Sequence, residues 1–359
     1  MSRDSDRHEG GDRHRVVETG GNDAPDGREL LRRPKRQSRH RLTILLVLST
    51  MISAPFLAAQ ADQGEDEGDP KPLTLQQALG FASGHPRTQS SEAAALFPRR
   101  QPLYLGCHEF SFTGTPGRDD SRDVAWSKLL TAEDQQRMEI TQRFYDVLLA
   151  DLSYSRDNEA MAVAYVQFDR AAAREELGQF SPLAVAELEA AYQLVRRQRA
   201  ASEAAQLITR SLLAQAMGRP EDLPRDLVTP DLNPQQAPLP ELDAVVAEAM
   251  EKNPRIKELM TGGSGAERML VEMEVRQQAL ELLTRLNLLN VIAEQARSES
   301  NWRDLKLDES RTMYELEAKA DLGFSMSQQT KARRDEEQVA LCTILTRAEL
   351  EALQGHAAP

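Results

Sequence analysis

The residues able to carry catalytic or metal chemistry are few after the first 61 positions. Three histidines occur there, His85, His108 and His356, and they lie far apart in the sequence. None stands with cysteine or carboxylate residues at the spacing of a metal site, and no nucleophile stands at a recognisable spacing from a base. The glycine-rich stretch 262–265 lacks the Lys-Ser/Thr pair of a phosphate-binding loop. We predict a protein with no catalytic residues, no cofactor and no metal site.

The two cysteines, Cys107 and Cys342, are far apart in the sequence. Two cysteines do not make a disulfide scaffold, and we expect Cys342 to pack as a small apolar residue inside a helix. The sequence Leu105-Gly106-Cys107 resembles a lipoprotein acceptor site, but it lies well past any signal peptide. We therefore predict no lipid at Cys107.

The N-terminal 61 residues have the layout of an export signal. Basic residues from Arg32 to Arg41 precede an apolar stretch from Leu42 to Ala58, and a small-residue cleavage site, Ala59-Gln60-Ala61, follows. The apolar stretch is shorter than the roughly 20 residues of a spanning helix. We predict a signal peptide cleaved near Ala61; the alternative is a retained membrane anchor. The polar residues before the basic run are expected to be disordered, or they precede the true start site.

The charge of the chain differs between this leader and the remainder. Residues 1–61 hold 11 Lys and Arg against 8 Asp and Glu, and the remaining 33 basic and 49 acidic residues leave a net charge of −16. An acidic chain repels nucleic-acid phosphates, so no nucleic-acid partner is expected. Aromatic residues make up 5% and charged residues 28% of the chain, which suits long helices packed side by side better than a thick core.

Two long stretches, 131–177 and 266–322, keep a helical apolar pattern without an internal proline or glycine. In the first, the apolar spacing averages near 3.5 residues, which is the period of a coiled coil. A helix of this length would extend roughly 70 Å. The first stretch ends at Gly178, and Ser181-Pro182 begins a return helix that reaches about Met217. The second ends at Leu322-Gly323, after which Ser325 or Ser327 is expected to cap a last helix ending near Leu353.

One hairpin of strands is expected, between the first short helix and the first long helix. Alternating residues predict a strand over 103–113, and 124–127 could return beside it after a turn. The second half offers only residues 255–261 at the matching place, fewer than the roughly 9 to 11 residues of a lipid-spanning strand.

The order of these elements occurs twice. Each half has a short helix stopped by proline, a long helix, a turn of the form Leu-Gly-x-x-Ser or Leu-Gly-x-Ser, and a return helix that closes on glycine. In the short-helix turn, His85-Pro86 of the first half matches Asn253-Pro254 of the second, so His85 is expected to serve the turn. We predict a first repeat at 62–237 and a shortened second repeat at 238–359, since tandem units bury a face that neither buries alone.

This order, twice over behind a signal peptide, resembles the TolC family of outer-membrane efflux proteins. The likeness is strongest over 140–220, particularly Phe144 to Ala150 and Gly178 to Glu189. It is also strong over 307–353, where Ser310 to Leu316 looks like the family's final helical pair. The resemblance implies a homotrimer in the outer membrane. Its helices would form a periplasmic tunnel, and it would act as a passive duct joined by a periplasmic adaptor protein to an inner-membrane pump.

In this family the helix tips that match Gly178, Ser181, Gly323 and Ser325 face the adaptor. A glycine lets another helical hairpin approach the backbone closely, and a serine hydroxyl offers a hydrogen bond. The resemblance therefore implies that these four residues contact an adaptor. The alternative is that they only make the turns.

The predicted fold is mostly α, with long antiparallel coiled-coil helices in two tandem TolC-like repeats. It has at most one short β-hairpin, so the strands of the family's barrel are reduced or missing. Two functions follow. The first is an outer-membrane efflux or export duct; the alternative is a non-conducting periplasmic helical scaffold, a truncated relative that lacks a complete barrel. The exported substrate, the pump partner and the gating residues cannot be read from the sequence.

Overall fold

The computed structural model describes residues 71–107, 126–232, 238–316 and 322–356. The predicted signal peptide, most of the predicted hairpin and the boundary between the predicted repeats lie outside these ranges. Among the described residues the structure is helical, with one isolated parallel bridge between Leu73 and Leu227. The helices are α1 (Leu75–Leu79), α2 (Pro86–Gln89), α3 (Ser91–Leu96), α4 (Trp126–Leu129), α5 (Ala132–Glu176), α6 (Pro182–Ala216), α7 (Leu242–Lys252), α8 (Pro254–Gly262), α9 (Gly265–Glu315) and α10 (Leu322–Leu353).

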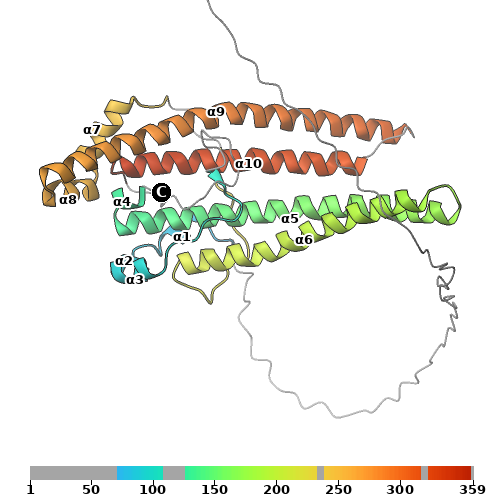
Figure 1. Cartoon of the computed structure of the whole chain (residues 1–359), viewed down its shortest axis with the longest axis horizontal. Helices are drawn as coiled ribbons and strands as arrows, with labels where there is room; N and C mark the ends of the chain where they lie inside the picture. The colour runs from blue at the N-terminus through green and yellow to red at the C-terminus, as the bar shows by residue number, and fades with distance from the viewer. Residues whose placement is uncertain (1–70, 108–125, 233–237, 317–321, 357–359) are drawn as a thin grey trace, which may run out of the picture. The chain divides into compact units, whose positions relative to one another are not determined.

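The four long helices form one layer in the order α6, α5, α10, α9 (Figure 1). The α5/α6 and α9/α10 hairpins meet where α5 packs against α10. In Figure 1 the C-terminal ends of α5 and α9 lie at the same end of the layer. The predicted helical fold and the long helices of the first half are therefore confirmed.

The ends of α5 and α6 follow from local signals. Thr131 caps α5 by accepting a hydrogen bond from the Asp134 amide, and Ser181 caps α6 by accepting one from the Ala184 amide, just before Pro182. Gly178 then adopts a left-handed conformation, with φ of 71°. Its amide and that of Gln179 donate to carbonyl oxygens in the last turn of α5, which closes the helix in a Schellman motif.

Each half of the chain closes in the same way, at a left-handed glycine beside a proline turn. In the first half, His85 Nε2 donates to the Gln215 carbonyl oxygen at 3.0 Å, while its Nδ1 accepts the Arg87 amide and caps α2. In the second half, Asn253 Nδ2 donates to the Leu353 carbonyl oxygen at 3.0 Å, while its Oδ1 accepts two amides at the start of α8. One side chain therefore caps two helices, and the turn role expected for His85 is confirmed.

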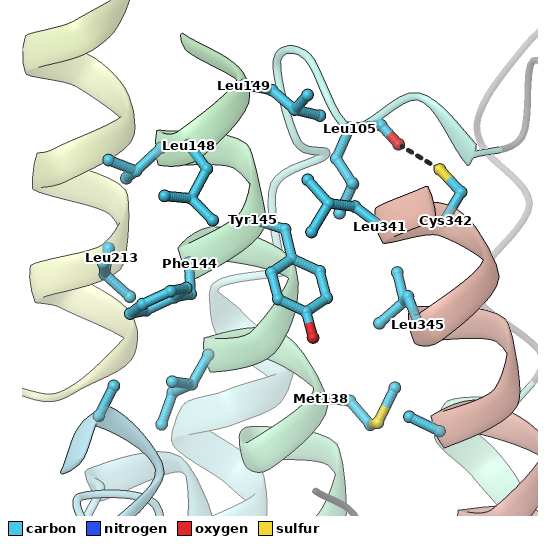
Figure 2. Packing of buried hydrophobic residues seen from close by; sticks show 14 of the residues in the cluster. Leu105, Met138, Phe144, Tyr145, Leu148, Leu149, Leu213, Leu341, Cys342 and Leu345 are labelled. Carbon is cyan, nitrogen blue, oxygen red and sulfur yellow. Dashed lines mark hydrogen bonds between the residues drawn. The ribbon is translucent and has the colours of Figure 1, made fainter. Parts of the chain in front are cut away.

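The seam between α5 and α10 is the centre of the larger hydrophobic cluster (Figure 2). Tyr145 of α5 lies toward Leu341 and Leu345 of α10, whereas Phe144 and Leu148 of α5 face α6. Phe144 is fully buried and Tyr145 is 2% exposed. Burial also raises the pKa of Tyr145 to about 12. A second cluster joins α7, α8 and α9 to the end of α10.

Residues 99–107, here called the strap, cross this seam without forming a strand. The Asp146 carboxylate of α5 accepts three successive strap amides, those of Leu103, Tyr104 and Leu105, at 2.6 to 3.0 Å. Burial raises the pKa of Asp146 above its ordinary value, and the three amide donors oppose that shift. The carboxylate accepts the hydrogen bonds that these amides would otherwise donate to a neighbouring strand. The strand predicted from 103 is thus wrong over 103–107, and 126–127 lie in α4.

Two further α5 side chains hold the start of the strap. The Arg143 guanidinium donates to the carbonyl oxygens of Arg100 and Gln101, and Arg99 forms an ion pair with Glu139 at 2.8 Å. Glu139, Arg143 and Asp146 recur at spacings of four and three, so they share one face of α5. The strap is therefore fastened along two turns of a single helix.

The structure corrects two other expectations. Cys107 and Cys342 form a disulfide across 235 residues, so Cys342 is bonded and does not merely pack as a small apolar residue. The second long helix ends at Glu315, before the expected Leu322, and Ser325 and Ser327 lie inside α10 and do not cap it. Two short helices that the sequence analysis does not predict, α2 and α3, lie between the His85-Pro86 turn and the strap.

Replacement of Gly355 by alanine should destabilise the fold far more than the same change at Gly178. A Cβ at Gly355 would lie 2.6 Å from the Asn253 amide nitrogen, in a residue with φ of 85°, whereas a Cβ at Gly178 meets nothing within 4 Å. We expect Gly355→Ala to lower the free energy of unfolding by about 2 to 4 kcal/mol and Gly178→Ala by about 1 kcal/mol. Urea unfolding of both variants measures the two free energies. Equal losses in the two variants would contradict the close approach of Gly355 to the Asn253 backbone.

Replacement of Asp146 by alanine should free the strap, because three buried amides would lose their acceptor together. We expect the free energy of unfolding to fall by about 2 kcal/mol or more. Asp169→Ala is the matched control, since Asp169 is an exposed carboxylate on the same helix. Hydrogen exchange of the Leu103 to Leu105 amides should speed up in the first variant and not in the second; unchanged exchange in both would show that Asp146 does not hold the strap.

Candidate functional site: the helix tips

The first candidate site is the turn between α5 and α6. Gly178 lies in open space, with no other atom within 4 Å of the position a Cβ would take, so its backbone is accessible. The Ser181 hydroxyl accepts the Ala184 amide at 3.2 Å and so serves the turn. Two leucines flank the turn, Leu177 at 72% and Leu183 at 71% exposure. This tip offers an open backbone flanked by apolar side chains.

The second candidate site is the corresponding end of α9 and α10. Gly323 lies in the first turn of α10, and the turn itself, 317–321, is outside the described residues. Ser325 is 9% exposed, and its hydroxyl lies 2.7 Å from that of Ser310 on α9. The Ser325 hydroxyl therefore joins two helices of this chain. The structure brings Gly178 to Ser181 together at one tip and Gly323 to Ser325 together at the other.

Sequence analysis missed the apolar residues around both tips. At the second tip these are Tyr314, Leu316 and Phe324, which are between 50% and 71% exposed. Large apolar side chains at the accessible end of a hairpin are typical of a surface that another protein covers. The sequence did contain a signal for these exposed apolar residues, because an apolar residue stands next to each tip glycine. Leu177 precedes Gly178, and Phe324 follows Gly323.

A separate cleft of about 710 Å³ lies between α9, α10 and the residues that lead into α7. Two arginines, Arg297 and Arg347, and three glutamates line it together with asparagine, threonine and apolar groups. Burial, with the nearby Glu336 carboxylate, raises the pKa of Glu337 above its ordinary value. The mixture of both charge signs points to no single ligand, so this cleft is not assigned a function.

Within the described ranges, no helix is both long and apolar enough to cross a membrane. The same residues contain no group of three or more His, Cys, Asp and Glu side chains placed to hold a metal ion.

No protein-family model and no curated protein matches this sequence. Solved structures do match. The transmembrane channel CusC is 11% identical, with a TM-score of 0.51, and the match covers 78% of this chain and 96% of CusC. The open-state outer membrane channel MtrE of Neisseria gonorrhoeae is 12% identical, with a TM-score of 0.41, and the match covers 79% of this chain and 89% of MtrE.

A membrane protein from Pseudomonas aeruginosa is 14% identical, with a TM-score of 0.33, and the match covers 64% of this chain and 73% of that protein. Of these three similarities, the one to CusC exceeds a TM-score of 0.5 and spans nearly all of the CusC chain. At 11% identity it shows the arrangement of the helices, not a shared activity. This chain has the helical fold of the TolC family of outer-membrane channels.

Proposed function

We propose that this chain is the outer-membrane component of an efflux or export assembly. It conducts passively, without enzymatic activity, and an inner-membrane pump and a periplasmic adaptor supply energy and connection. The observation that carries the proposal is a layer of four long helices, one helix thick and in the TolC-type arrangement, with α6 at one edge and α9 at the other. Such a layer buries its apolar side chains where neighbouring helices meet, so it is suited to forming the wall of a tunnel.

Each outer helix of the layer carries exposed apolar side chains among its charged ones. On α6, Leu207 and Ile208 are 61% and 47% exposed, and on α9, Val291 and Leu305 are 63% and 70% exposed. Exposed apolar stripes of this kind mark interaction surfaces. Because the two edges come from different helices, joining the α9 edge of one copy to the α6 edge of the next is a heterologous contact, which closes into a ring when the rotation permits. We propose a ring of three copies, as in the TolC family.

The tips support the proposed adaptor contact. They lie at the end of the long helices, carry exposed apolar side chains, and in the first case expose the backbone around Gly178. We propose that Gly178, Ser181 and Gly323 lie within this contact, and that Ser325 supports it from beneath by holding α10 to α9. In this proposal the chain is connected to the inner-membrane pump through the adaptor and does not contact the pump directly.

A second candidate function is a periplasmic helical scaffold that docks on adaptors without conducting. Residues 254–262, which lie between the short and long helices of the second half, form α8 and leave no extended segment there. Residues 103–107 of the first half are likewise not a strand. The two candidates share the fold and the tips, and they differ in whether the assembled chain conducts.

Conductance and mass together decide between these candidates. The full-length chain, expressed with its own N-terminus and purified from membranes, should give discrete single-channel steps in planar bilayers and the mass of a trimer by light scattering. Leu207→Glu places a charge on the α6 edge and should abolish both signals, whereas Leu96→Glu, at a residue 74% exposed on α3, should preserve them. A monomer that never conducts, from a chain with native helicity, would instead support the scaffold.

Adaptor binding tests the tips. Leu177→Asp and Gly323→Trp should each weaken co-purification of a periplasmic adaptor protein by about tenfold or more, because one adds a charge to an apolar contact and the other adds bulk where close approach is needed. Leu96→Asp is the control, because it adds the same charge at an exposed leucine away from the long-helix tips. Adaptor binding that is unaltered in both tip variants would rule out the proposed contact.

A further inference from the structure

The disulfide between Cys107 and Cys342 fastens the end of the strap to the last helix of the chain. Cys342 lies on α10 and is fully buried, and Cys107 is partly exposed. The Leu105 carbonyl oxygen lies 3.5 Å from Cys342 Sγ, as Figure 2 shows, and Leu105 itself is 1% exposed. The bond thus closes over a side chain that is packed into the seam between α5 and α10.

The noncovalent contacts hold the two ends of the strap unequally. Toward α5 the strap has the Asp146 carboxylate, the Arg143 guanidinium and the Glu139 ion pair. Toward α10, Gln338 Nε2 donates a hydrogen bond to the Tyr104 carbonyl oxygen at 3.1 Å. The disulfide, one turn further along α10, adds a covalent bond between the strap and this helix.

We propose that Cys107 and Cys342 form a redox-operated clasp that locks the strap of the first half onto the last helix of the second half. The clasp closes by exchange with an oxidised dithiol, either a thiol–disulfide oxidase or a small disulfide. It opens when a dithiol reductant attacks it. α5 retains its contacts to the strap in both states, up to the Leu105 amide, so opening frees the end of the strap at Gly106 and Cys107.

The difference in burial sets the order of the exchange. The Cys107 thiolate attacks a sulfur of the oxidant, forming a mixed disulfide and releasing one oxidant thiolate. The Cys342 thiolate then attacks Cys107 Sγ, forming the Cys107–Cys342 bond and expelling the second oxidant thiolate. The oxidant leaves as a dithiol that has gained two electrons, and the two cysteine protons pass to it through solvent. Reduction runs through the same intermediate, with the reductant bonded to Cys107, because Cys342 is covered.

A clasp of this kind forms in an oxidising compartment. On the proposed export of the chain, locking of the strap would follow arrival outside the cytoplasm. The α5 contacts, which involve no redox chemistry, can place the strap before the bond forms.

The test compares the two single-cysteine variants with oxidised glutathione as the probe. Cys342→Ser leaves the partly exposed Cys107 thiol, which should gain one glutathione by mass spectrometry. Cys107→Ser leaves the buried Cys342 thiol, which should gain none until the chain is unfolded in urea. Equal reactivity of the two folded variants would overturn the proposed order.

The second readout is the full-length wild-type chain, which needs no substitution. Purified without reductant, it should contain no alkylatable thiol, and tryptic digestion should yield the Cys107 and Cys342 peptides joined. After reduction, amide exchange at Gly106 and Cys107 should become roughly tenfold faster, while Leu105, held by Asp146, and Phe144 to Leu149 of α5 keep their protection. Free thiols in the unreduced chain, or unchanged exchange after reduction, would refute the clasp. Neither readout uses conductance, so the clasp and the duct can fail separately.

Discussion

The contact between α5 and α10 is the constraint on which the structure depends. Within each hairpin, a short connection links the two helices. The two hairpins, in contrast, are held together by packing, where Tyr145 of α5 lies toward Leu341 and Leu345 of α10. Because the long helices form one layer, each inner helix has only two long neighbours, and a lost neighbour exposes a full apolar face. The strap strengthens the weakest line of such a layer, since it crosses the seam, fills it with Leu105 and bonds to both helices.

The two halves of the chain reach one architecture with different side chains. His85 and Asn253 each cap the start of a short helix and, with another atom, the end of a long one. Both residue types can donate and accept hydrogen bonds from one side chain, which is what a doubly capping position requires. The second closure is tighter, because a Cβ at Gly355 would lie 2.6 Å from the Asn253 amide nitrogen, whereas a Cβ at Gly218 would lie 3.2 Å from the His85 ring.

The same thin layer explains why the helix edges and tips are the surfaces of interest. Its outer helices α6 and α9 carry exposed apolar side chains along their length, and its tips expose others. In the function proposed above, the chain covers these apolar side chains with other polypeptides, either further copies of itself or an adaptor. The proposed function is therefore an assembly function.

The sequence by itself determined the four long helices and the ends of the first two, α5 and α6. Apolar periodicity, Thr131 and Ser181 as caps, and Gly178 as a left-handed stop act over a few residues, so they can be read locally. The tertiary structure alone decided the strap. Leu103 to Cys107 alternate like a strand, but their amides are taken by Asp146, about 40 residues away, and Cys107 is bonded across 235 residues. It also decided that Ser325 is buried against Ser310, because only the packing of α9 on α10 places those hydroxyls together.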